Sequence, residues 1–97
     1  MWIGWIEFDL LLGDVHSLKE KRGLVRPLVA DLQKRLQVAV AEVGHLDLHR
    51  RAGIGLTCVA ADRAHVVDVL DTAERLVADR GEYQLLSAHR GLISSDD

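Results

Sequence analysis

The alternation of side chains over residues 2–12 restricts the fold more than any other feature of the chain. One face carries Gly4, Ile6, Phe8, Leu10 and Leu12, and the other carries Ile3, Trp5, Glu7, Asp9 and Leu11. Successive residues of a strand point to opposite faces, so the pattern predicts a long strand with one buried face. Gly13 and Asp14 end it. A strand of this kind needs neighbouring strands and a layer that covers its apolar face.

A helix is predicted next, over residues 17–36. Ser17 followed by Glu20 forms a capping box, in which Glu20 reaches back to the Ser17 N–H group. An apolar stripe recurs at helical spacing and comprises Leu18, Val25, Val29, Leu32 and Leu36. The stripe keeps its phase past Pro27, so we expect one helix with a kink at that residue.

The remaining elements complete a βαββαβ order. They are strands at 38–43, 54–61 and 83–92, and a helix that Asp62 caps and that ends near Gly81. On the third strand, the even-numbered residues, including Cys58, are expected to face inward. The order predicts an α+β, ferredoxin-like fold, in which two helices cover one face of a four-stranded antiparallel sheet. We expect a single domain over 1–93 and a disordered acidic tail over 94–97.

Composition and charge exclude several classes of function. The formal net charge is −3, so no overall field draws the chain to nucleic acid or to an anionic membrane. Glu7 and Asp9 interrupt the apolar N-terminal run, which also lacks the basic start of a signal peptide. One cysteine cannot form an internal disulfide. These features favour a cytoplasmic protein with no membrane contact.

Three segments resemble the YlxP-like family of small bacterial proteins of unknown function. They are "SLKEKR" at 17–22, "VAVAEVGHLDLHRRA" at 38–52 and "DRAHVVDVLD" at 62–71. The resemblance runs from Gly4 to about Leu92 and implies a ferredoxin-like fold. It implies no catalytic mechanism. Members of the family often lie in gene neighbourhoods with translation and antitermination factors, which implies a role near RNA or the ribosome by association.

The first predicted helix carries a local excess of positive charge. Candidate residues for contact with RNA or an acidic partner are Lys19, Lys21, Arg22, Arg26, Arg50 and Arg51. Lys19, Arg22 and Arg26 lie within about 60° of one another on a helix that turns 100° per residue. Clustered cations on a rigid helix can position a phosphate backbone without reading its sequence. The alternatives are that the charges only solvate the helix, or that this helix pairs with the acidic second helix of another copy.

The uncovered face of the predicted sheet is a second candidate surface. Ile3, Trp5, Leu11 and Val59 form its apolar part, which suggests a protein interface or a homodimer. The alternative is that long neighbouring side chains cover this patch. RNA-recognition folds of this topology stack bases on aromatic residues of the central strands, but the third strand has none.

The remaining polar and nucleophilic residues give little support to catalysis. His45, Asp47 and His49 alternate and could bind a metal ion, but a pair of surface-loop histidines is the favoured explanation, since such motifs are permissive. Cys58 is expected to behave as a small buried hydrophobic residue. The chain contains no asparagine, which the acylphosphatases of the same topology require. We therefore expect no enzyme and no cofactor.

Two hypotheses of function remain, from different classes. The first is a non-enzymatic protein that binds ribosomal RNA or a ribosome-assembly intermediate through the basic helix face. The second is a protein-interaction module that forms a homodimer, or docks a protein factor, through the open sheet face and makes no nucleic-acid contact. A small-ligand sensor is a weaker third option, for which no residue selects a ligand.

Overall fold

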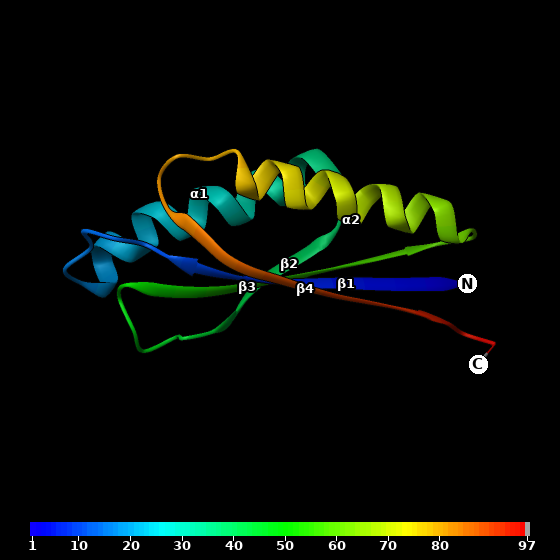
Figure 1. The fold of residues 1–97 in the computed structure, drawn as a ribbon, viewed down its shortest axis with the longest axis horizontal. Helices are drawn as coiled ribbons and strands as arrows, with labels where there is room; N and C mark the ends of the chain where they lie inside the picture. The colour runs from blue at the N-terminus through cyan, green and yellow to red at the C-terminus, as the bar shows by residue number, and fades with distance from the viewer. Residues whose placement is uncertain (97) are drawn as a thin grey trace.

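A computed structural model describes residues 1–96 of the chain, in the predicted order of elements (Figure 1). The elements are β1 (Trp2–Leu11), α1 (Leu18–Leu36), β2 (Ala39–Gly44), β3 (Arg51–Ala60), α2 (Arg63–Ala78) and β4 (Gln84–Ser94). The strands form one antiparallel sheet in the order β2-β3-β1-β4. Figure 1 shows both helices on the same side of this sheet. The predicted ferredoxin-like α+β fold is therefore confirmed.

Two strands extend beyond their predicted limits. β3 begins at Arg51 rather than at residue 54, because Arg51 pairs with Leu11 and the Leu12 N–H group donates to the Arg50 carbonyl. β4 ends at Ser94, which pairs with Trp2, so the first residue of the predicted tail belongs to the sheet. Asp97 of that tail lies outside the described residues. β1 is thus paired along its whole length on both sides, which satisfies its backbone N–H and C=O groups.

The core lies between the sheet and the two helices, as the alternation predicts. Ile6, Phe8 and Leu10 of β1 are almost fully buried there. Ile54, Leu56 and Cys58 of β3 face the same side, and Val66, Leu70, Ala73 and Val77 of α2 pack against them. Burial raises the pKa of the Cys58 thiol, in keeping with its predicted role as a small hydrophobic residue.

The start of α1 is capped by side chains on both sides. The Glu20 N–H group donates to Ser17 Oγ at 3.1 Å, as predicted. Glu20 itself accepts from the His16 N–H group at 2.9 Å rather than from Ser17, because its side chain reaches one residue further back. Leu18 is 40% exposed and lies outside the core. The helix then continues without a break through Pro27.

α2 begins as predicted and ends earlier. Asp62 accepts from the His65 N–H group at 2.8 Å and caps the helix. The last helical residue is Ala78, three positions before Gly81. Neither helix within residues 1–96 combines the length and the apolar character that crossing a membrane requires.

Candidate binding surfaces

Three of the predicted cations form an exposed cluster on α1. Lys19, Arg22 and Arg26 are exposed, and together with Gly23 and Pro27 they line a shallow hollow on the outer surface of the helix. Within residues 1–96, none of the three cations forms an ion pair. We call these three residues the basic face. Their charge is available to an external anion.

Other cations of the chain are held by carboxylates inside the molecule. Arg90 of β4 binds Asp71 at 2.8 Å and Glu74 at 3.3 Å, both on α2. Asp31 accepts from Arg35 and from Arg80. Part of the negative charge of α2 is therefore neutralised within the domain. The basic face differs from these sites because it lacks such partners.

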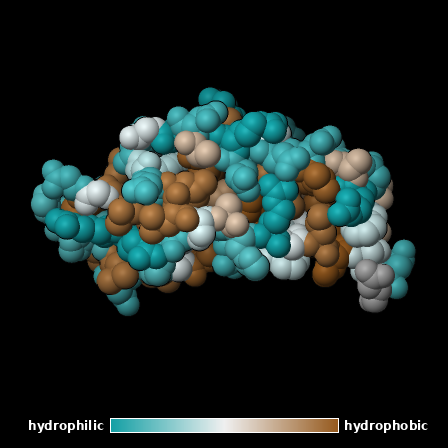
Figure 2. All heavy atoms as spheres, in the orientation of Figure 1, coloured by the Kyte–Doolittle hydropathy of each residue, from teal (hydrophilic) through white to brown (hydrophobic). Residues whose placement is uncertain are grey.

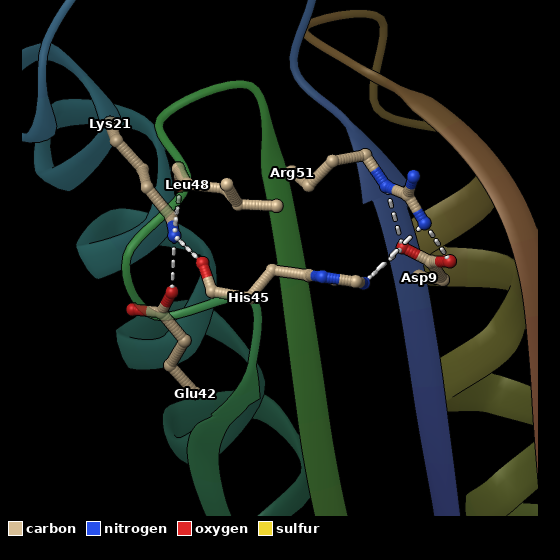
Figure 3. Close-up of polar contacts among 6 residues, drawn as sticks. All are labelled: Asp9, Lys21, Glu42, His45, Leu48 and Arg51. Atoms are coloured by element: carbon tan, nitrogen blue, oxygen red, sulfur yellow. Dashed lines mark hydrogen bonds and ion pairs between the residues drawn. The ribbon is translucent and has the colours of Figure 1, made fainter.

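Lys21 does not belong to the basic face. Its side chain is 3% exposed, and Nζ donates to the carbonyls of His45 at 2.8 Å and Leu48 at 2.7 Å (Figure 3). Nζ also lies 2.7 Å from Glu42 Oε2 as an ion pair, without the angle of a hydrogen bond. Lys21 is therefore not part of the exposed surface that was predicted to contact RNA or a partner. Lys21 instead ties α1 to β2 and to the turn that follows β2.

Arg51 is also absent from the basic face. It is the first residue of β3 and points to the open side of the sheet, where its guanidinium group binds both carboxylate oxygens of Asp9 (Figure 3). The helices lie on the opposite side, so a shared patch with α1 is excluded. Arg50 is exposed, and its Nε lies 3.4 Å from the Val15 carbonyl in the β1–α1 connection. It therefore remains a candidate at the end of the domain where α1 begins.

The alternating residues His45, Asp47 and His49 do not gather into one cluster in the part of the chain that the structure describes. His45 has a positive φ of 57°, and its ring Nε2 lies 3.4 Å from Asp9 Oδ1 and 3.4 Å from Arg51 Nη2. Within residues 1–96, no three histidine, cysteine, aspartate or glutamate side chains gather closely enough to hold a metal ion. His49 and Asp47 are exposed in the connection after β2. His45 thus closes a polar cluster with Asp9 and Arg51.

The open face of the sheet carries an apolar patch at one end only. The register places Val59, Ile3 and Ile93 in one row across β3, β1 and β4. Val59 is 60% exposed and Ile93 is 49% exposed. Leu11, which the sequence analysis groups with these residues, lies at the far end of β1 beyond Glu7 and Asp9. The predicted patch is therefore divided by carboxylates.

Trp5 adjoins this apolar row and covers part of β4. A Cβ atom added at Gly91 would overlap the six-membered part of the Trp5 ring, so the indole lies directly over the glycine. Beside Trp5, a hollow of about 360 Å³ reaches Ala39, Ala41 and Val43 of the edge strand β2. Sequence reasoning missed Val43 and Ile93, although their alternation within β2 and β4 contained the signal.

The two faces of the domain differ in their surface character. Figure 2 shows mainly hydrophilic atoms over the helices and hydrophobic patches that reach the lower rim, on the side of the sheet that the helices leave open. The basic face lies on the helix side of the sheet, and the apolar row of Val59, Ile3 and Ile93 lies on the open side.

Comparisons with known proteins place the chain in a family without assigning an activity. An uncharacterized protein, YlxP, from Bacillus subtilis (strain 168) is 31% identical over 61 residues, which cover 63% of this chain and 66% of the relative. That match spans slightly less than two thirds of the relative's own length. A crystal structure of a mutant of SnoaB, a cofactor-independent oxygenase from Streptomyces nogalater, superposes with a TM-score of 0.50 at 10% identity. It covers 99% of this chain and 94% of SnoaB, and this likeness shows a shared fold alone. Residues 3–90 match the family described as "Protein of unknown function (DUF503)", and the chain belongs to that family.

Proposed function

We propose that the protein is a non-enzymatic binding protein that contacts RNA, in a ribosomal or ribosome-assembly particle, through the basic face of α1. The observation that carries the proposal is the set of three exposed cations, Lys19, Arg22 and Arg26, without ion-pair partners in residues 1–96. They contrast with Arg51, Arg80 and Arg90, which carboxylates hold. In a chain of net charge −3, this local excess favours a polyanionic partner.

The geometry of α1 supports contact with a phosphate backbone. A regular helix holds side chains at fixed spacing, and Lys19, Arg22 and Arg26 line one hollow. Cations near the start of a helix are mildly unfavourable against its dipole, so their presence there suggests a use beyond the stability of the helix. The open sheet face lacks aromatic residues on β3, so base stacking on the sheet does not support the proposal.

Charge reversal of the basic face tests the proposal. We expect the triple variant Lys19→Glu, Arg22→Glu, Arg26→Glu to lose co-sedimentation with ribosomal particles. The matched control reverses Lys34, Arg63 and Arg75, which also lie on the helices and form no ion pair within the described residues. Both variants must keep the circular dichroism spectrum of the natural protein. Association that survives in the first triple variant, with the fold intact, would refute the proposal.

Salt dependence gives an independent quantitative check. Three phosphate contacts to a single strand predict a slope of about −2 in log affinity against log salt. Raising salt from about 50 to about 200 mM would then weaken binding roughly 20-fold. An affinity that does not change with salt would contradict contact through the basic face.

A second candidate function is homodimer formation through the open sheet face. The row of Val59, Ile3 and Ile93, next to Trp5, is an exposed apolar surface that no helix covers. We expect Trp5→Glu to lower the mass measured by light scattering from dimer to monomer. Leu11→Glu, on the same face but beyond the carboxylates, is the matched control. A natural protein that is monomeric at high concentration would exclude this candidate.

A further inference from the structure

A second hollow, of about 230 Å³, lies between α1 and the turn that follows β2. Its apolar walls are Leu18 and Val25 of α1 and Leu46 of the turn. Leu18 is 40% exposed and Leu46 is 60% exposed, so both leucines present apolar surface to solvent on either side of the opening. The volume is below the roughly 300–1,000 Å³ typical of sites for drug-sized ligands, and suits one planar group.

This hollow shares two lining residues with the hollow of the basic face. Arg22 and Arg26 line both this hollow and the shallow one that contains Lys19. A polyanion that contacts the two arginines therefore passes the opening between Leu18 and Leu46. In an RNA strand, each phosphate is joined to a ribose that carries a base, so a base lies close to every phosphate. Arginine planes and apolar side chains are surfaces on which unstacked bases are held.

Glu42 supplies a hydrogen-bond acceptor in the wall of the hollow. Its Oε2 atom is paired with Lys21 Nζ at 2.7 Å, which fixes the direction of the carboxylate. Figure 3 shows the second oxygen of Glu42 turned away from Lys21. Because Lys21 balances the charge of Glu42, the carboxylate does not cancel the attraction of the arginines for phosphate. One carboxylate oxygen can then accept a hydrogen bond from a bound group.

The turn that forms one wall is held in place before any ligand binds. Lys21 Nζ donates to the carbonyls of His45 and Leu48, and the Leu48 N–H group donates to the His45 carbonyl at 3.0 Å. Leu46 lies between these anchored residues. A wall fixed in advance lowers the entropy lost when a ligand binds.

We propose that this hollow binds a single unpaired base of the RNA, and that Glu42 selects a base with an exocyclic amino group over uracil. The inference rests on the proposed contact of the basic face with RNA. An amino group donates to a carboxylate, as cytosine N4 does to glutamate, whereas uracil presents a carbonyl oxygen at the same position. Cytosine and uracil have the same ring size, so their comparison isolates this interaction.

Fluorescence anisotropy with short labelled oligonucleotides tests the inference. The probes are an all-uridine single strand and the same strand with one central cytidine. We expect the cytidine strand to bind roughly tenfold more tightly, the difference typical of one favourable base contact. The variant Glu42→Gln should abolish this preference, because its amide can donate to the uracil carbonyl. Glu7→Gln, on the open sheet face, is the matched control and should keep the preference.

The outcomes separate this inference from the proposed function. If the natural protein binds both strands equally, base selection is overturned. If that binding is lost on charge reversal of the basic face, the proposed contact with RNA still stands. A cytidine preference that persists in the Glu42→Gln variant overturns the role of Glu42. No binding to either strand at low salt overturns both proposals, and then directs attention to a protein partner for the leucines and arginines.

Discussion

Replacing Lys21 by methionine removes one charged group and tests whether this buried lysine holds the domain together. Methionine keeps the apolar stem, so the variant mainly deletes the ammonium group. The carbonyls of His45 and Leu48 then lose a charged donor, and Glu42 loses the partner 2.7 Å away. We therefore expect a large loss of stability from a residue that the sequence analysis groups with the candidate binding residues.

The magnitude follows from the burial of each partner. Breaking a buried ion pair by removing one member costs about 3–5 kcal/mol. Glu42 Oε2 is buried, but its side chain as a whole is 26% exposed, so the pair is only partly buried and the lower end, about 3 kcal/mol, applies. For a domain of this size, that loss corresponds to a fall of about 12–24 °C in the melting temperature.

The assay is thermal and denaturant unfolding, followed by circular dichroism, with Lys19→Met as the matched control. Lys19 lies on the same turn of α1, is exposed and forms no ion pair among residues 1–96. Its replacement should change stability by at most about 0.5 kcal/mol. If Lys21→Met and Lys19→Met unfold at the same temperature, the reasoning that Lys21 is structural is refuted.

Two further predictions concern single aromatic residues. Burial raises the pKa of Tyr83 to about 12, and its hydroxyl group donates to the Val77 carbonyl at 2.6 Å. The stability that Tyr83 contributes should be complete below pH 10 and be lost as pH rises toward 12, because the unfolded chain then releases the proton more readily. The phenolate absorbance of this sole tyrosine measures the titration. A titration midpoint near 10 would contradict the raised pKa. Gly91→Ala should displace the Trp5 ring and destabilise the domain by about 1–3 kcal/mol, detected by unfolding and by tryptophan fluorescence. Gly81→Ala, where an added Cβ meets nothing within 4 Å, is its control, and equal effects at the two glycines would refute the overlap.

Much of the fold was predictable because it depends on local periodicity. The alternation of β1 and the cap residues Ser17 and Asp62 act over a few residues, and the structure confirms each of them. The predicted start of β3 lies three residues too late, because Gly53 and Gly55 weaken the strand pattern. Pairing with the full length of β1 overrides that weakness.

The candidate surfaces were less predictable because they depend on contacts between distant segments. The acceptors of Lys21 are backbone carbonyls 24 and 27 residues away, and no side-chain pattern identifies a carbonyl as a partner. The late predicted start of β3 leaves Arg51 in a connection, where no alternation assigns it to a face. Once its register with Leu11 is known, the alternation of β3 places it on the open face.

The segment from Ser17 to Arg22 combines three tasks because helical geometry separates its side chains. Ser17 caps the helix, while Lys21 points away from Lys19 and Arg22 and into the turn after β2. At 100° per residue, Lys19 and Lys21 lie about 160° apart, so one lysine can be buried while the other stays in solvent. The inward lysine fixes the helix against the turn that carries Leu46, and the outward cations are thereby held at a constant position beside the hollow. Under the proposed contact with RNA, the Lys21→Met variant should bind RNA more weakly because the wall that carries Leu46 loses its anchor. Lys19, Arg22 and Arg26 are unchanged in this variant, so the salt slope should stay that of the natural protein.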